Sequence, residues 1–548
     1  MRQNPEPSLF VADTTEAEDM IVQMQNVQGL FVNYYNANKL DLIAEELFSG
    51  TDTSALYMPD YDIDVIGKEN IVEAFASLQE MRSESDVTDI HLLASPYYSA
   101  SEDGQAGHAA WDTYTYTFDT TVYNCDIAFT HFDIRFVKTD NGCAIESLKW
   151  YTMQSWVPWD YEDVEKEYLD AGLDRLSELE LPEITNDISA QDFVDIQKLQ
   201  NVFFANGMNF VIWTFANNEE ITFSMENIGI SDVVGITELA SVLTDLKDKE
   251  TENNGFYITE GMCTSPVITM TGEDSATGWY LVQTFDMKGP AFGNTEPPYD
   301  LVRNLCQLRA NYIRVDGQWK VQDFDLRELV ALPALPYESS TQFRDKMSTG
   351  TNWTVQTIDI TSSDPSDVFE IENLIYGWVT ALRRGDDLVE YFENHINNDE
   401  VPFYMYLMSS GVAAEKVTGE EAMRNQVVSL SSTFINLQPN YHTATTPVIE
   451  ISADGLHAHA QWMEHSLTNM AKALGVDENG VFNYMIFSAR YAHDFTKING
   501  VWYLTGFTWE PLIHIPNWKF DPANSKGWAG SSSTQKYPYA GEEYTLIK

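Results

Sequence analysis

The sequence predicts an α+β protein built from three tandem copies of one fold, each with three helices followed by a curved antiparallel sheet. The chain has 548 residues, 44% of them hydrophobic, which is enough for three separate cores. The same succession of short signals also occurs three times along the chain. Equivalent prolines stand about 170 and about 181 residues apart, a spacing of domain size and far longer than a solenoid repeat.

Each copy shows a glycine that opens an amphipathic helix, a Ser/Thr-Pro step expected to start a strand, and a hairpin turn. The glycines are Gly67, Gly235 and Gly419, the Ser/Thr-Pro steps lie at 95–96, 265–266 and 446–447, and the turns lie at 140–142, 316–317 and 499–500. Three or four strands at hairpin spacing follow each glycine-started helix. A curved sheet wrapped over helices encloses a conical pocket, so each copy is expected to hold one.

A long helix is expected at the start of each copy. In the third copy Asp364 supplies an N-cap and Pro365 the first helical residue, and in the second copy 189–192 resembles a capping box. The first copy begins its helix near Thr15, with apolar residues behind it at helical spacing. A second helical turn is expected at 42–48 in the first copy and at 388–392 in the third.

These signals divide the chain into domains at 1–165, 186–338 and 364–548, the last with a C-terminal tail. Residues 166–185 form a charged connector that is expected to be helical. Residues 339–363 are rich in Ser, Thr and Asp and are expected to be a linker.

The charge balance excludes several classes of partner. The chain carries 31 Lys and Arg against 84 Asp and Glu, a formal charge of −53, which repels nucleic acid and anionic membranes. The N-terminus is polar, no apolar run is long enough to span a bilayer, and the four cysteines have no CxxC spacing. We therefore expect a cytoplasmic protein with reduced thiols, no nucleic-acid or membrane partner, and a small-molecule ligand.

The third copy carries the clearest family likeness. Its segment 385–388 at the end of the first helix, and 489–495 leading to the turn and Trp502, resemble the SnoaL-like branch of the nuclear-transport-factor-2-like (NTF2-like) superfamily. The resemblance implies a cone-shaped α+β barrel with a deep pocket. The superfamily includes dehydratases, isomerases and cyclases of polyketides and steroids, and many members without catalysis, so the fold does not fix the function.

The histidines distinguish the copies, because all ten lie outside the middle one. His91 and His442 both stand five residues before the proline step, where the middle copy has Gly261. Twelve residues after the proline, the first and third copies carry His108 and His459, whereas the middle copy carries Gly278. The middle copy also has Thr284 where the other copies carry a polar or aromatic residue. We therefore expect the middle copy to be catalytically silent.

In relatives, the resemblance implies that the histidine before this strand faces the pocket, with a histidine or aspartate a little over twenty residues later as its partner. Counting from His91 reaches Asp112 or Tyr114, and counting from His442 reaches Glu464 or His465. Alternation along a strand places every second residue on the same face, so one set of polar and apolar residues is expected on the pocket face of each copy. The two sets are Asp112, Tyr114 and Tyr116 in the first copy, and Met463 and His465 in the third. The alternative is that each histidine is an ordinary buried residue of the fold.

Several aromatic residues are expected to line pockets, where tyrosine hydroxyls could stabilise an enolate. They are Tyr34, Tyr35, Tyr57, Trp378, Tyr404 and Tyr406. The alternative is an ordinary aromatic core. The aspartate that the family carries near the end of its first helix is not matched, since Asn38, Ala216 and Arg383 stand there. Its absence puts in doubt any mechanism that needs that carboxylate.

The leading hypothesis is a lyase or isomerase acting on a hydroxylated or keto-bearing polycyclic or aromatic molecule. Histidine would remove a proton next to a carbonyl, and a second histidine or acid would protonate the leaving hydroxyl. No cofactor is expected, because no phosphate-binding glycine loop occurs, and no metal, because His457 and His459 lack a third ligand. The alternative is a non-catalytic small-molecule-binding or assembly protein. Two copies are expected to pair through their sheet faces, leaving a third face for a homodimer.

Overall fold

A computed structural model describes most of the chain. The described residues are 14–119, 121, 124–140, 142–158, 175–176, 179–184, 187–205, 211–252, 256–289, 300–333, 363–384, 391, 394–395, 404–407, 415–418, 425, 441–469 and 482–520. The expected turn at 388–392, the glycine-started helix at Gly419, the linker and the tail fall almost entirely outside these residues, as does most of the connector.

The elements form three successive units. Unit 1 comprises α1 (Thr15–Asn36), α2 (Leu40–Leu42) with a π-helical turn (Ile43–Leu47), β1 (Ala55–Met58), β2 (Ile63–Ile66), α3 (Lys68–Ser83), β3 (Val87–Ala100), β4 (Ala106–Asp119), β5 (Asn124–Thr139) and β6 (Gly142–Pro158). Unit 2 comprises α5 (Ala190–Ala205), β7 (Thr222–Met225), β8 (Ile230–Val234), α6 (Ile236–Glu252), β9 (Phe256–Gly272), β10 (Ser275–Gly289), β11 (Asp300–Val315) and β12 (Gln318–Pro333). Unit 3 comprises α8 (Pro365–Arg384), β13 (Tyr404–Leu407), β14 (Glu415–Thr418), β15 (Tyr441–Ile451), β16 (His457–Asn469), β17 (Phe482–Ile498) and β18 (Val501–Phe520).

The three units have the same strand order. It is β2-β1-β6-β5-β4-β3 in unit 1, β8-β7-β12-β11-β10-β9 in unit 2 and β14-β13-β18-β17-β16-β15 in unit 3. Neighbours are antiparallel, except that the first short strand of each unit runs parallel to the last long one. The end of β18 also pairs with β6, which joins the sheets of units 1 and 3 into one of twelve strands. The α+β class predicted from the sequence is confirmed.

The helix and turn signals act as expected. Pro365 opens α8, and the backbone N–H of Ser366 donates to the Asp364 side chain at 3.1 Å. The α1 cap is Thr14, one residue before the expected start, and its hydroxyl accepts from the N–H of Ala17 at 3.2 Å. The turn at Asn499 and Gly500 has positive φ at both residues, the geometry that matches the twist of a two-residue hairpin.

The Ser/Thr-Pro steps, in contrast, do not start strands. They lie inside β3, β9 and β15, at positions where the strand pairing shifts by one residue. Ser95, Ser265 and Thr446 all have positive φ, between 47° and 56°. Proline has no N–H to give to the ladder, so the strand bulges instead of ending.

The bulges hold the three units together in a cyclic arrangement. The hydroxyl of Ser95 accepts from the N–H of Ala444, at 2.9 Å, so unit 1 binds unit 3. In the same way Thr446 binds unit 2 and Ser265 binds unit 1, which closes the ring. These backbone N–H groups lie next to the bulges, where the regular ladder is interrupted.

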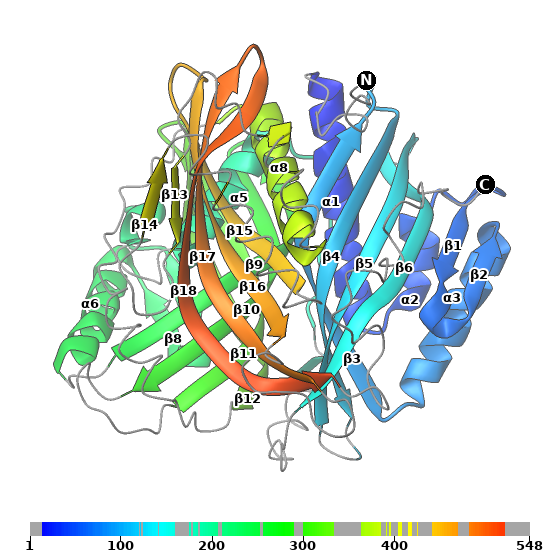
Figure 1. The fold of residues 1–548 in the computed structure, drawn as a ribbon, viewed down its shortest axis with the longest axis horizontal. Coiled ribbons are helices and arrows are strands. Elements are labelled where there is room, and N and C mark those ends of the chain that lie inside the picture. The colour runs from blue at the N-terminus through cyan, green and yellow to red at the C-terminus, as the bar shows by residue number, and fades with distance from the viewer. Residues whose placement is uncertain are drawn as a thin grey trace.

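The long helices repeat this cycle. Asn26 of α1 accepts from the N–H of Ile268 at 2.8 Å and donates to its carbonyl at 2.9 Å, and Asn373 of α8 makes the same two bonds with Tyr98 at 2.8 Å. Asn201 of α5 donates to the carbonyl of Pro447 at 2.8 Å. Figure 1 shows α1, α5 and α8 lying together between the sheets.

Contacts among all three units replace the expected pairing of two copies, and side chains on the sheet faces, such as Tyr114 and His465, take part in them. Helices of one unit pack on the bulged strand of the next, because the bulge leaves backbone groups that the helix asparagines can bind. The homodimer stays a prediction.

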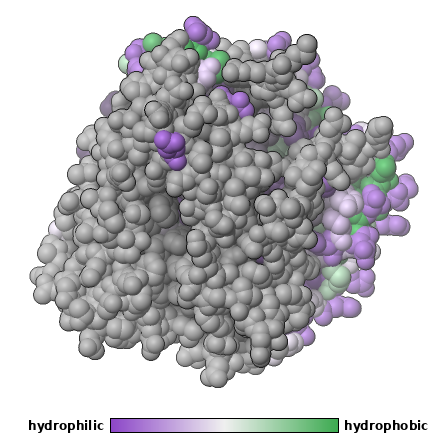
Figure 2. All heavy atoms as spheres, viewed as in Figure 1, coloured by the Kyte–Doolittle hydropathy of each residue, from purple (hydrophilic) through white to green (hydrophobic). Residues whose placement is uncertain are grey.

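The described surface carries hydrophilic residues together with isolated apolar ones. In Figure 2 the right edge, over β1, β2 and α3, is mostly hydrophilic. Ile66 and Met81 are exposed there at 46% and 50%. Within the described part of the chain, no helix has both the length and the apolar character needed to cross a bilayer.

Candidate functional site

The first candidate site lies in the interior of unit 1, around His91 on β3. The His91 ring meets the rings of Tyr35 and Trp150 edge to face, with centroids 5.0 Å and 4.9 Å away. Asn36 at the end of α1 holds the His91 backbone, accepting its N–H at 2.9 Å and donating to its carbonyl at 3.1 Å. The helix thus positions the strand on which the histidine stands.

Both ring nitrogens of His91 have partners. Nδ1 lies 2.8 Å from the hydroxyl of Thr115 on β4, and Nε2 lies 2.9 Å from a carboxylate oxygen of Asp89. Asp89 also forms an ion pair with Arg82 of α3. Burial by itself would raise the pKa of Asp89, but Arg82 and the bond to His91 lower it below its usual range. An ionised Asp89 accepts from Nε2–H, which leaves the Nδ1 lone pair to accept from Thr115.

Two phenols complete this site. The hydroxyls of Tyr35 and Tyr61 lie 3.0 Å apart, and the guanidinium of Arg82 lies 4.1 Å from the centre of the Tyr35 ring. Burial, followed by the charge of Asp89, raises the pKa of Tyr35 well above its usual value and that of Tyr61 to about 12. Both phenols therefore stay protonated near neutral pH and can donate hydrogen bonds to an oxyanion.

Asp112 is not the partner of His91. His91 opposes Thr115 across the β3–β4 ladder, so its face carries the odd-numbered residues of β4, whereas Asp112 is on the other face. There Asp112 lies 2.9 Å from Nδ1 of His131 on β5, and both side chains are buried. The expectation failed because counting along the chain does not give the register of the pairing.

Tyr114 and Tyr116 share that other face and meet the other units. The Tyr114 ring stacks on His465 of unit 3 at 4.2 Å, and the Tyr116 hydroxyl donates to Gln283 of unit 2 at 2.7 Å. His465 is fully buried, and burial, with a smaller effect from Arg303, lowers its pKa well below the usual value. These residues form a contact between the three units and do not line the unit 1 site.

The second candidate site lies inside unit 3. His442 opposes Ser466, so Glu464 is on its face while His465 and Met463 are on the opposite one. Nδ1 of His442 forms a hydrogen bond with Glu464. The expectation that His442 and His465 face one cavity is therefore wrong, and Glu464, the other residue reached by the count, is the partner.

Further groups on this face belong to the same interior. Glu464 also forms a hydrogen bond with Tyr491, whose pKa is raised first by burial and then by that carboxylate. The ring centroids of Tyr491 and of Trp378 on α8 each lie 5.7 Å from the ring centroid of His493. Burial lowers the pKa of His493 to about 3, so this ring is neutral. Trp378 is thus placed in the interior, as expected.

The other predicted residues lie elsewhere. The Tyr34 hydroxyl donates to Glu46 at 3.0 Å, and Tyr57 lies beside Lys149, which opposes it on β6. The side chains of Tyr404 and Tyr406 are outside the described residues. His459 lies 2.7 Å from Asp494 and is partly exposed, and the described residues contain no group of three side chains suited to a metal ion.

In unit 2 an aromatic side chain occupies the position of the histidine. A Cβ atom at Gly261 would lie 2.1 Å from Cδ1 of Phe204, so this glycine makes room for the ring. Phe204 belongs to a cluster that fills the interior with Phe203, Phe215, Phe223 and Phe324. Thr284 accepts hydrogen bonds from Asn227 and Asn304. The silence of this copy stays a prediction, and this packing supports it.

Sequence reasoning missed Asp89, Arg82, Tyr61, Trp150, Tyr491 and His493. Asp89 could have been predicted, because residues two apart on a strand share a face, and Asp89 and His91 are such a pair. Arg82 comes from another element, and only the fold brings it to the site.

Comparisons with known proteins give partial matches to solved structures. No family model matches the chain, and no curated protein matches it. A Streptomyces avermitilis protein described as a candidate dehydratase of the NTF2-like family matches with 14% identity and a TM-score of 0.23, over 28% of this chain and 99% of its own. The hexachlorocyclohexane dehydrochlorinase LinA-type3 from Novosphingobium barchaimii LL02 matches with 12% identity and a TM-score of 0.21, over 27% and 86%. The Kfla4162 protein from Kribbella flavida matches with 14% identity and a TM-score of 0.23, over 27% and 93%.

Proposed function

We propose that the chain consists of three tandem SnoaL-like domains and that units 1 and 3 are cofactor-independent acid–base sites of the lyase or isomerase type. The substrate class is a hydroxylated or keto-bearing polycyclic or aromatic small molecule. One observation carries the proposal: in each of these two units a histidine inside the cone is bound to a carboxylate, at Asp89 in one and Glu464 in the other.

The unit 1 geometry supports proton transfer at a defined atom. Asp89 binds Nε2 of His91 and fixes the tautomer, so Nδ1 is the atom that takes a proton from carbon next to a carbonyl. Thr115, which binds Nδ1 here, would turn away as substrate enters. Tyr35 and Tyr61 would donate to the developing enolate oxygen, and the protonated His91 would return its proton to the leaving hydroxyl. In unit 3 Glu464 binds Nδ1 of His442, so Nε2 is the corresponding atom.

The non-catalytic alternative also has an observation in its favour. His91 and His442 are only 2% and 4% exposed, and their hydrogen bonds satisfy a buried ring as well as they would orient a catalytic one. On this alternative, the histidines stabilise the cones of a small-molecule-binding or assembly protein.

Hydrogen–deuterium exchange separates the two functions without knowledge of the natural substrate. The bicyclic ketone 2-tetralone is incubated with the protein in D₂O, and deuterium uptake next to the carbonyl is followed by NMR. We expect catalysed uptake that falls at least about 10²-fold in the double variant His91→Gln/His442→Gln. His457→Gln, at an exposed position, is the matched control. Uptake no faster than in buffer, or equal in the double variant, would favour the binding protein.

A further inference from the structure

A small cavity lies where the three units meet, apart from both candidate sites. Its volume is about 50 Å³, enough for a few water molecules or one small ion. The bulges of β3, β9 and β15 line it, with side chains from α1, α5 and α8. Each unit thus contributes the same two elements to its wall.

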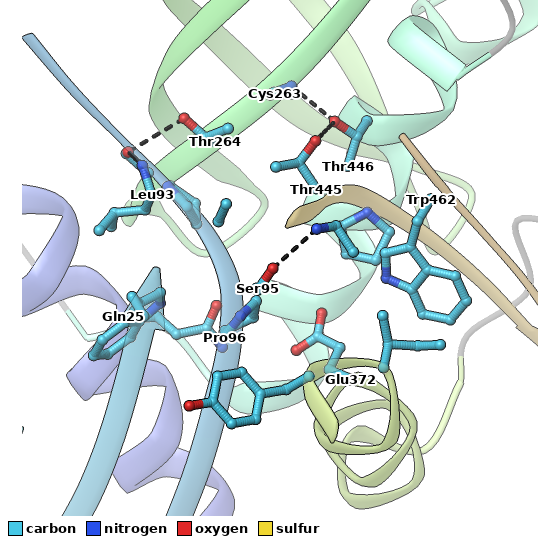
Figure 3. Close-up of a pocket in the computed structure, with 18 of the residues that line it drawn as sticks. Gln25, Leu93, Ser95, Pro96, Cys263, Thr264, Glu372, Thr445, Thr446 and Trp462 are labelled. Carbon is cyan, nitrogen blue, oxygen red and sulfur yellow. Dashed lines mark hydrogen bonds between the residues drawn. The ribbon is translucent and has the colours of Figure 1, made fainter. Parts of the chain in front are cut away.

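One acidic side chain enters this cavity. Figure 3 shows the carboxylate of Glu372 directed away from α8 and toward Ser95. Glu372 is 3% exposed, and its Oε2 has no hydrogen-bond partner among the described residues. Burial raises the pKa of this carboxyl to about 8.

The acid is peculiar to unit 3. Glu372 precedes Asn373, which binds the neighbouring unit, and the residues in the same place before Asn26 and Asn201 are Gln25 and Gln200. Two units therefore carry a neutral amide where the third carries a carboxyl of the same shape. The difference concerns charge and not packing.

The remaining lining is rich in oxygen and has no positive charge. Ser95, Ser265, Thr264, Thr445 and Thr446 contribute hydroxyls, and no Lys, Arg or His is among the described residues that line the cavity. Gln25 adds an amide side chain to the lining. Among the described lining residues an ionised Glu372 would therefore have no counter-ion, and a buried charge without one is strongly unfavourable.

We infer that this cavity binds one monovalent cation of small size, with the Glu372 carboxylate neutralising its charge and hydroxyl and amide oxygens completing its shell. Hard cations prefer oxygen ligands, and Ca²⁺ takes six to eight of them, usually with several carboxylates. A single carboxylate balances a single positive charge. When the cation enters, the carboxyl O–H breaks and its proton goes to solvent, so the cavity exchanges one H⁺ for one cation.

Such a cation would stabilise the junction of the three units, since it binds the folded chain alone. Its apparent affinity rises with pH up to about pH 8, because protons compete for the same carboxylate. The inference does not depend on catalysis in units 1 and 3.

The test compares small cations with one too large for the cavity. Thermal unfolding of the full chain is measured at pH 7 and pH 9 in chlorides of K⁺, Na⁺, NH₄⁺ or N-methyl-D-glucamine at equal ionic strength. Equal ionic strength removes the general screening of the −53 charge. Glu372→Gln carries the amide that the other units use, so it is expected to fold. Glu370→Gln, on the same helix and partly exposed, makes the same change of charge.

We expect at least one small cation to raise the unfolding midpoint above that in N-methyl-D-glucamine, in the natural chain and in Glu370→Gln, and more so at pH 9. The effect should vanish in Glu372→Gln. Isothermal titration of that cation at pH 7 in two buffers of different protonation enthalpy should show release of up to one proton per ion. Equal midpoints in all four salts, or a small-cation effect that persists in Glu372→Gln, would overturn the inference and leave Glu372 as a protonated acid.

Discussion

Replacement of Asn26 by leucine should weaken the contact between units 1 and 2. The Asn26 side chain is 5% exposed and satisfies both backbone groups of Ile268, at 2.8 Å and 2.9 Å. Leucine has nearly the same size but neither donor nor acceptor, so it leaves a buried N–H and a buried C=O without partners. Each such group costs about 1–3 kcal/mol, and the expected loss of unfolding free energy is therefore about 2–6 kcal/mol.

Urea unfolding followed by tryptophan fluorescence measures this loss. Asn70→Leu is the matched control, because Asn70 makes one bond of the same kind, to the carbonyl of Ile66 at 2.7 Å, but on the exposed surface. Water replaces that partner, so the control should change stability by less than about 0.5 kcal/mol. An Asn26→Leu protein that loses no more than the control would refute the role of the asparagine in joining the units.

Two further predictions concern the interiors of units 1 and 2. Gly261→Ala places a Cβ atom against Phe204, and the overpacking should lower the free energy of unfolding by about 1–3 kcal/mol, measured by urea unfolding. Adding Phe204→Leu to the same chain should recover part of this loss. An unchanged unfolding midpoint in Gly261→Ala would show that the Phe204 ring moves freely. The second concerns acid stability. The folded-state pKa of Asp89 lies below the unfolded value of about 3.9, so the unfolded chain binds more protons as the pH falls. The stabilisation is fully present above about pH 5 and is lost progressively as the pH falls from about 4 toward the lower folded-state pKa. Asp89→Asn should therefore destabilise the protein at pH 7 and flatten its loss of stability below pH 5, whereas Asp52→Asn, at an exposed position, should leave both unchanged.

Much of the architecture could be read from local signals. Pro365 after Asp364 marked the start of α8, and Asn499-Gly500 marked a hairpin, because caps and turns depend on a few adjacent residues. The recurrence of these signals predicted repeated units, and the structure shows the same strand order in each. The equivalent positions of His91 and His442 before the proline also indicated the two interiors in which a histidine binds a carboxylate.

Which residues face each other was decided by the tertiary structure alone. The face of a strand residue changes with a shift of one position in register, so counting from His91 pointed to Asp112, which lies on the other face. The partners are Asp89, two residues away on the same strand, and, through Asp89, Arg82 of α3. For the same reason His465 lies at the junction of the units, and Glu464 lies on the same face as His442 and binds it. The sequence alone thus determined which elements form and where they begin, since those choices depend on neighbouring residues. Register depends on how separate strands pair, and the cyclic contacts through the bulges join residues 172 to 349 positions apart, so only the folded chain decides them and the position of Glu372.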